Sequence, residues 1–396
     1  MPAVPAVPAV PPSPAPRGRL RSPASPSSSS KAGRADTASP AGLAPPVSLL
    51  DPGVERDPYP FYRTLREGFP LVRDELLGAW LLSRYADVRA ALGDTRLGSV
   101  DTGLSPAYRG LLEPALRAAA ERTAHVLARR IGGRREVDLV AEFSGWLPAA
   151  AAAAALGLPW EDAARVHEWC RTGPVPPGGS HPELEGLLRP HVARRRAHPG
   201  ADLLSALCGA RVAGQALSDE AVTGLAGTLL TGGGEATALA LASFLANLLD
   251  HPAQLDLVRA RPGLIPGAWA ESLRRDPPAP VVLRRATVPI TLGGTTLPAG
   301  AAVACLVGSA GRDPFRYADP DRYDIFRPDP AHLAFGAGRR FCLAATLAGL
   351  AAECGLRALL DAMPGLRWAP GFRPAPSGLM ARAPRALVVR PSQGPF

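Results

Sequence analysis

The stretch Phe335-Gly-Ala-Gly-Arg-Arg-Phe-Cys342 decides the fold, because a cysteine ends a glycine-containing loop at the start of an alanine- and leucine-rich helix. A helix N-terminus offers backbone donors and positive potential, and both stabilise a thiolate. A thiolate is the electron-donating ligand that haem iron uses where O–O cleavage must be favoured. Gly336 and Gly338 let the backbone approach a flat macrocycle closely, and Arg340 is suited to pair with a propionate. The loop therefore predicts a haem-thiolate site.

Two other interpretations of this loop stay open from the residues alone. Cys342 could be a buried structural cysteine that follows a turn. The glycines could also form a loose phosphate-binding loop, but a Gly-x-Gly-x-x-Gly pattern needs glycine at position 341, which is Phe341.

Three further motifs agree with the loop in order and spacing. They are Leu229-Leu-Thr-Gly-Gly-Gly-Glu235-Ala-Thr237, Glu271-Ser-Leu-Arg274 and Asp319-Pro-Asp-Arg322-Tyr323. With them the chain resembles the cytochrome P450 family, the haem-thiolate monooxygenases, of the soluble bacterial kind. The resemblance covers about Val47 to Pro391. It implies a mainly α fold with small β-sheets (α+β), in which a long central helix lies over the haem. The roof elements, which are the loop and the lid that cover the haem in the family, are shortened in this chain.

The resemblance also implies roles for single residues. The cofactor is haem b (iron protoporphyrin IX), with the Cys342 thiolate as its axial ligand. Phe335, Arg340 and Gly233 belong to the haem-binding set, and Arg284 and His332 occupy positions that meet the propionates in relatives. A buried ion network consists of Glu271, Arg274 and Arg322. It locks the meander, which is the segment around the motif Asp319-Pro-Asp-Arg322-Tyr323, beneath the Cys342 loop. An apolar pocket is expected from the residues Leu230, Val281, Val282, Leu379 and Met380.

The central helix is predicted to begin at Ser218, a good N-cap, and to end before Pro252. About 33 residues at 1.5 Å rise make it ~50 Å long, which is enough to cross the domain. Three consecutive glycines cost roughly 1 kcal/mol each against alanine, so they need a reason. The family opens a dioxygen groove here, and close helix packing also favours small residues.

The expected catalytic set is Glu235, Ala236 and Thr237, and it departs from the family. The family follows the acid with a threonine whose hydroxyl helps to deliver protons, whereas Ala236 stands at that position. Thr237 lies about 100° further around the helix and cannot simply substitute. Some family members with alanine here use a substrate hydroxyl or an ordered water, and others abandon the ordinary dioxygen cycle.

The roof also departs from the family. The loop that normally precedes the third helix is short. Tyr108 and Leu112 stand where the family has a His-x-x-x-Arg pair that binds the propionates. Arg109 or Arg117 could compensate for this missing pair. The lid is replaced by the segment 173–180. A short roof suggests an open pocket or a bulky, tethered substrate, and decay of catalysis would leave the same pattern.

The whole chain predicts one mostly helical domain over 47–396 behind a disordered Pro/Ala/Ser-rich tail over 1–46. Its 46% hydrophobic residues exclude a wholly disordered protein. Five basic residues against one acidic residue put +4 of the +9 net charge in the tail. The remaining charge forms no basic stripe, so nucleic-acid binding is not expected. Five cysteines without a CxxC pair disfavour a disulfide framework. The longest apolar run, 149–155 with its flanks, is too short to cross a membrane.

Local patterns predict the remaining elements. Expected are a helix entry over 57–65, two strands around Gly78 within 71–82, a helix over 85–92 and a helix-dominated region to about 252. Short strands with a hairpin at Gly293-Gly294 are expected within 281–307, then a helix over 342–362 and a last strand over 386–389.

The leading functional hypothesis is a cytoplasmic, monomeric oxidoreductase of bacterial specialised metabolism. It would oxidise an apolar or bulky small molecule, carrier-tethered in one version, with dioxygen and electrons from a ferredoxin-type partner. The alternatives are a haem-thiolate enzyme that uses peroxide or catalyses a redox-neutral rearrangement or cyclisation, and a catalytically silent recruitment module of the same fold.

Overall fold

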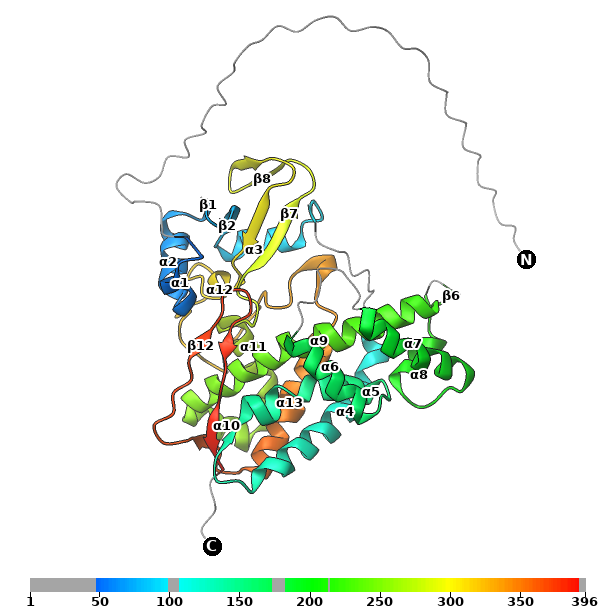
Figure 1. The fold of residues 1–396 in the computed structure, drawn as a ribbon. Helices are drawn as coiled ribbons and strands as arrows, with labels where there is room; N and C mark the ends of the chain where they lie inside the picture. Colours follow the sequence, from blue (N-terminus) through cyan, green and yellow to red (C-terminus); the bar gives the residue numbers. More distant parts are fainter. Residues whose placement is uncertain (1–47, 99–106, 173–181, 213, 392–396) are drawn as a thin grey trace, which may run out of the picture. The chain divides into compact units, whose positions relative to one another are not determined.

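The computed structural model describes residues 48–98, 107–172, 182–212 and 214–391. The expected disordered tail, the short loop before the third helix and the segment 173–180 lie outside the described residues. The mainly α fold with small sheets is confirmed (Figure 1).

The helical elements are described in two sets. The helices of the body are α4 (Ala107–Gly132), α5 (Leu147–Ala155), α6 (Trp160–Thr172), α7 (Pro182–Ala197), α8 (Leu203–Gly209), α9 (Asp219–Asp250), α10 (Pro252–Ala260), α11 (Ile265–Arg275) and α13 (Ala345–Ala362). The remaining ones are α1 (Pro52–Arg56), α2 (Tyr59–Gly68), α3 (Tyr85–Gly93), α12 (Val307–Ala310), and the π or 3-10 turns η1 (Val140–Ser144), η2 (Pro262–Leu264) and η3 (Gly338–Arg340).

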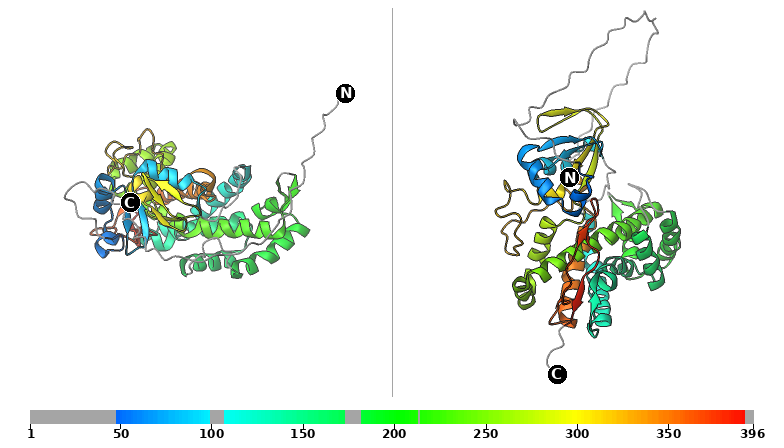
Figure 2. Two further views of the ribbon diagram at one scale, coloured as in Figure 1. Left: turned by 90° about the horizontal axis from the view of Figure 1, so that it is seen from above. Right: turned by 60° about the vertical axis from the view of Figure 1, so that its left-hand side comes forward.

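The largest core lies where α4, α5, α9 and α13 pack together (Figure 2). Small residues allow this close approach. A Cβ added at Gly355 of α13 would lie 2.8 Å from Leu147 Cδ2, and one added at Gly132 would lie 2.9 Å from the Ala362 carbonyl. The alanine run of α5 is buried in this core, where its small side chains let the neighbouring helices approach.

The central helix α9 begins and ends as the sequence predicts. Ser218 caps it, because its Oγ accepts a hydrogen bond from the Ala221 amide at 3.2 Å, and Asp250 is its last residue. By length and composition, α9 is long and apolar enough to cross a membrane. It is therefore a stronger candidate for a membrane-spanning segment than the alanine run 149–155. However, 71% of its most apolar window is buried inside the protein, as in the core helix of a soluble fold.

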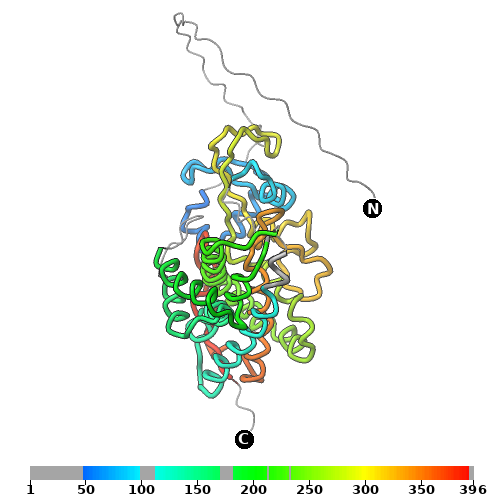
Figure 3. Tube along the Cα trace, turned by 90° about the vertical axis from the view of Figure 1, so that its right-hand side faces the viewer, coloured from blue at the N-terminus to red at the C-terminus, as the bar shows by residue number. Residues whose placement is uncertain are grey.

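The main sheet joins two segments that are far apart in the sequence, 71–98 and 282–305. Its strand order is β1 (Leu71–Asp74), β2 (Ala79–Leu82), β10 (Ala302–Cys305), β7 (Val282–Ala286) and β3 (Leu97–Gly98), and only the β2–β10 pair is parallel. Figure 3 shows the blue N-terminal strands beside the yellow ones. The predicted hairpin is confirmed as β8 (Ile290–Leu292) and β9 (Thr295–Leu297), turning at Gly293 and Gly294 with φ of +52° and +81°.

Three smaller sheets complete the fold. One has the order β11 (Arg367–Trp368), β14 (Val388–Arg390), β4 (Val137–Asp138), and two pairs are β12 (Pro376–Ser377) with β13 (Ala383–Pro384) and β5 (Arg211–Val212) with β6 (Gln215–Ala216). Two predicted boundaries shift: the last helix begins at Ala345 rather than Cys342, and the last strand spans Val388–Arg390.

Candidate active site

The cysteine loop is closed by its own backbone. The Cys342 amide donates to the Phe335 carbonyl at 2.9 Å. Gly336 and Gly338 have φ of +76° and +67°, which L side chains rarely adopt. Cys342 therefore stands at the end of a tight turn, three residues before the first residue of α13.

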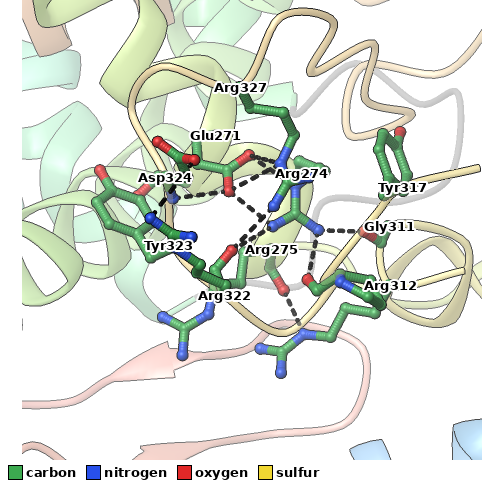
Figure 4. A network of polar contacts seen from close by, with 12 residues as sticks. Glu271, Arg274, Arg275, Gly311, Arg312, Tyr317, Arg322, Tyr323, Asp324 and Arg327 are labelled. Atoms are coloured by element: carbon green, nitrogen blue, oxygen red, sulfur yellow. Dashed lines mark hydrogen bonds and ion pairs between the residues drawn. The ribbon is translucent and has the colours of Figure 1, made fainter. Parts of the chain in front are cut away.

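A buried ion network joins α11 to the segment 311–327, which precedes this loop in the sequence (Figure 4). Arg274 donates Nε to Glu271 Oε2 at 2.7 Å and Nη2 to Glu271 Oε1 at 2.8 Å, and both side chains are completely buried. Arg327 donates its Nε to the same carboxylate at 3.0 and 3.2 Å. A bidentate carboxylate shared by two guanidinium groups has its acceptor sites filled, as burial of these charges requires.

The expected third member of this network, Arg322, is wrong as a side-chain partner. Its side chain is 69% exposed and lies 4.0 Å from Asp324 Oδ2. Its carbonyl oxygen takes part instead, accepting from Arg274 Nη2 at 3.2 Å and Arg327 Nη2 at 3.1 Å. The turn closed by the Arg322 amide on the Asp319 carbonyl directs the Arg322 carbonyl inward and its side chain outward (Figure 4). Arg327 was missed because it lies outside the motif that singled out Arg322.

The network fastens the meander to α11. Arg274 Nη1 also donates to the carbonyls of Gly311 and Pro320 at 2.6 and 2.8 Å, and Glu271 Oε1 accepts the Asp324 amide at 3.0 Å. One helix therefore holds the chain at several points between residues 311 and 327, just before the cysteine loop.

The middle of α9 has two different faces. Gly233 is buried, and a Cβ added there would lie 2.6 Å from Leu347 Cδ2 of α13, so its small size serves helix packing. Glu235 and Ala236 are exposed, although the rest of this stretch is largely buried. Thr237 is 4% exposed, on the buried side. The structure therefore separates Thr237 from the open face that Glu235 and Ala236 present.

Arg284 and His332 carry buried donors without acceptors. Arg284 Nε and His332 Nδ1 have no hydrogen-bond partner in the described part of the chain. Burial lowers the pKa of His332 to about 4, and burial likewise holds the pKa of Arg284 below its ordinary value. Both groups lack the anionic neighbour that would offset their desolvation.

Arg340 and Phe335 have other neighbours. Arg340 Nη1 donates to the carbonyls of Asp94 and Leu97 at 3.0 and 2.6 Å, and its Nη2 donates to that of Thr95 at 3.3 Å. These acceptors differ from the propionate expected for it. The Phe335 ring lies edge-on to His332, with ring centres 5.4 Å apart.

The predicted pocket residues divide in two. Leu230 and Val281 are 0% and 4% exposed and pack in two separate apolar cores, and their place in the lining of a pocket stays a prediction. Val282 and Leu379 are half-buried, and Met380 is 37% exposed. Leu283, which the sequence analysis did not select, is 49% exposed on β7.

The structure describes two of the four side chains at the position of the missing propionate pair and its proposed substitutes. Leu112, on α4, is buried in the largest core, and Arg117 of the same helix is paired with Glu353 of α13 at 3.3 Å. The side chains of Tyr108 and Arg109 lie outside the described residues.

Comparison with known proteins decides the family. A family profile described as Cytochrome P450 matches residues 266–362, which include the Glu271 network, the whole cysteine loop and the whole of α13. The cyclomarin C epoxidase CymV of Salinispora arenicola is 34% identical over 364 aligned positions, covering 81% of this chain and 91% of that protein. The chain belongs to the cytochrome P450 family. The P450 monooxygenase PikC of Streptomyces venezuelae is 32% identical, with 90% of this chain and 96% of PikC covered.

Solved P450 structures share the fold. CYP109E1 from Bacillus megaterium in complex with corticosterone superposes with a TM-score of 0.76 at 26% identity, covering 86% of this chain and 99% of that one. P450BioI in complex with an acyl carrier protein ligated to hexadec-9Z-enoic acid has a TM-score of 0.71 at 27% identity, covering 86% and 100%. The CymV alignment has more positions than the part of this chain that it covers, so that P450 contains residues without a counterpart here.

The residues present fit the P450 haem. Arg284 and His332 hold buried donors that suit an anionic propionate, and the glycine turn presents Cys342 without a bulky neighbour at 336 or 338. The exposed Ala236 and Glu235 leave open space in the middle of an otherwise buried helix. The cofactor of this family is a haem with a thiolate ligand, and the chemistry of this donor set agrees with it.

Proposed function

We propose that this P450 is a haem-thiolate monooxygenase in which Cys342 is the iron ligand. It acts in the cytoplasm on an apolar or bulky small molecule of bacterial specialised metabolism. The observation that carries the proposal is the turn that presents Cys342, together with Arg284 Nε and His332 Nδ1, two buried nitrogens without a hydrogen-bond partner in the described residues. The relatives include an epoxidase and a hydroxylase, which supports monooxygenation in general terms.

The bound haem supplies activation of dioxygen with two electrons, so that one oxygen atom enters the substrate and the other leaves as water. The residues of this chain hold and supply what that chemistry needs. Arg284 and His332 bind the propionates, and the Glu271 network keeps the meander behind the Cys342 loop. Glu235, exposed on α9, exchanges protons with water, and Ala236 leaves room for the substrate or an ordered water at the open face.

The first experiment is the absorption spectrum of the reduced, carbon monoxide-bound protein. Wild type should show the red-shifted Soret band of a thiolate-ligated haem, and Cys342→Ala should lose it. Cys208→Ala, which changes a buried cysteine of α8, is the matched control and should keep the band. A wild-type protein that binds no haem would reject the enzyme and leave the silent recruitment module as the function to test.

A second candidate is a peroxide-driven or redox-neutral P450 reaction, and Ala236 is the observation that favours it. Without a threonine hydroxyl at this position, the supply of protons differs from that of the dioxygen cycle. Product formation with peroxide and no reductase would support this candidate. Product formation only with an electron donor and dioxygen would reject it. Ala236→Thr should shift the balance toward the donor-dependent reaction.

For the donor-dependent reaction we propose a ferredoxin-type partner and a monomeric enzyme. Arg339, exposed beside the Cys342 loop, suits an acidic protein surface. Electron transfer should then slow as ionic strength rises, because exposed charges are screened. A rate that does not respond to salt would argue against an electrostatically guided donor.

A further inference from the structure

One side of the central helix α9 is open along about three turns. Gly224, Thr228 and Glu235 are exposed on it, and Thr231 is half-buried. Successive residues of an α-helix are about 100° apart, so spacings of four, three and four place these positions within about 60° of one another. They cover roughly 16 Å of the helix axis. These four positions are called the open stripe below.

The glycines of α9 separate the open stripe from the packed sides of the helix. A Cβ added at Gly224 would meet open space within 4 Å, apart from its own helix, in the described part of the chain. A Cβ added at Gly227 would lie 3.6 Å from Leu184 Cδ2 of α7, and one added at Gly233 would lie 2.6 Å from Leu347 Cδ2 of α13. The open stripe therefore lies beside the helices that cover α9, where a small molecule can reach it.

The two threonines of the open stripe direct their hydroxyl hydrogens back into the helix. Thr228 Oγ1 donates to the Gly224 carbonyl at 2.8 Å, and Thr231 Oγ1 donates to the Gly227 carbonyl at 2.9 Å. Threonines within helices commonly form this bond to the carbonyl four residues earlier. A hydroxyl has one hydrogen and two lone pairs, so each of these oxygens keeps only the capacity to accept a further hydrogen bond.

Glu235 completes the open stripe one turn beyond Thr231. An ionised carboxylate accepts hydrogen bonds and donates none. The backbone N–H groups in the middle of an α-helix are already bonded within the helix. The open stripe therefore offers acceptors and negative charge to a bound molecule, and its side chains offer no free donor.

We propose that the open stripe binds the substrate through N–H or O–H groups, with Thr228 and Thr231 as specificity-determining residues. The substrate then combines an apolar body with at least one hydrogen-bond donor that faces α9, such as a secondary amide or an alcohol. An ester, ether or tertiary amide would set its lone pairs against those of the threonines. The inference rests on the proposed monooxygenase function and names the substrate chemistry of that site.

The test compares amides that differ in a single N–H group. Pairs of secondary N-methyl and tertiary N,N-dimethyl amides are made with three apolar bodies, octanoyl, adamantoyl and naphthoyl. Their dissociation constants on the haem-loaded protein are measured by isothermal titration calorimetry, and a shift of the Soret band reports their arrival at the haem. The secondary amide of a pair that binds should bind about 3–10-fold more tightly than the tertiary amide.

Variants of the two threonines show where the preference originates. Thr228→Val and Thr231→Val keep the shape of the side chain and remove the acceptor. Each should reduce the preference in part, and the double variant should abolish it by weakening only the secondary amide, by about 3–10-fold. Thr228→Ser and Thr231→Ser keep the acceptor and should keep the preference. Thr223→Val changes a buried threonine of the same helix and is the matched control, which should bind both amides as wild type does.

The outcomes are distinct. Equal affinity of wild type for both amides, equal weakening of both by the valine variants, or no binding of any secondary amide would overturn the inference. A threonine that only stabilises the helix does not distinguish the two amides. A protein that keeps the thiolate band without this preference retains the proposed function and loses only the inferred substrate chemistry. A wild-type protein without a thiolate band would overturn the proposed function itself.

Discussion

Two polar regions of this P450, one around Glu271 and one around Arg284 and His332, differ in how many of their buried polar atoms have hydrogen-bond partners. Around Glu271, both carboxylate oxygens and the guanidinium groups of Arg274 and Arg327 are matched by one another and by carbonyls. Around Arg284 and His332, buried donors have no acceptor in the described residues. The first region is complete as a protein structure. The second has the form of a binding site, because an anionic group would satisfy it.

The largest effect is expected from breaking the complete region. Glu271→Gln leaves two buried guanidinium groups without a counter-charge, which should lower the free energy of unfolding by about 3–5 kcal/mol. Urea denaturation measures it. Glu353→Gln removes a partly exposed carboxylate paired with Arg117 and should cost less than about 1 kcal/mol. Equal losses in the two variants would contradict the special status of the network.

The incomplete region should be sensitive to acid. His332 has a folded pKa of about 4 and an unfolded pKa near 6.5. Between these two values the unfolded chain binds a proton at His332 and the folded chain does not. The free energy of unfolding therefore falls by on the order of 3 kcal/mol as the pH falls from about 6.5 to 4. Urea unfolding of haem-free protein at several pH values should show this slope, and His332→Gln should flatten it.

Bound haem should reduce this dependence of stability on pH. A propionate beside His332 would raise its pKa, so the haem-loaded protein should lose less stability over this pH range. A slope that is unchanged by haem would argue against the contact.

Arg284→Met should have opposite effects in the two states. Without haem it removes a half-buried cation whose Nε has no partner in the described residues, so the free energy of unfolding should rise by up to about 1 kcal/mol. With haem it removes a propionate partner, so haem should dissociate about 10-fold faster. Thermal unfolding and the transfer of haem to apomyoglobin measure the two effects. A loss of stability without haem would mean that the hydrogen bond from Arg284 Nη1 to the Leu283 carbonyl outweighs the unpartnered Nε.

The smallest effect is expected at Trp80. Its indole Nε1 is also buried without a partner, and the register Trp80–Val303–Arg284 places it on the same face of the main sheet as Arg284. Trp80→Phe removes this donor and the second ring of the indole, so the gain from the lost donor and the cost of the cavity should nearly cancel, and the free energy of unfolding should change by less than about 1 kcal/mol. A measurable acceleration of haem loss would instead add Trp80 to the propionate-binding set.

Local sequence signals predicted most of the fold and part of the site. Ser218 and Pro252 bracket α9 because capping and ring constraints act within a few residues, and Gly293-Gly294 identified the hairpin for the same reason. Partners distant in sequence were harder. Arg327 replaces Arg322, and Arg340 meets the 94–97 turn, because both depend on where a carbonyl points after the chain has folded. The sequence could not separate core residues from pocket residues around Leu230 and Val281, because an apolar residue looks the same in sequence whether it faces a core or a pocket.

The parallel pairing of β2 with β10 has a consequence for how the protein is made. The two strands are separated by about 220 residues, so at ~5–20 residues per second a ribosome needs roughly 10–45 s to deliver β10 after β2. Until then β1 and β2 form an isolated hairpin, which is marginal in water. Cys342 emerges after β10. The haem site therefore forms only after β2 and β10 have both been made, and the free edge of β2 stays open to chaperones and to other chains until then.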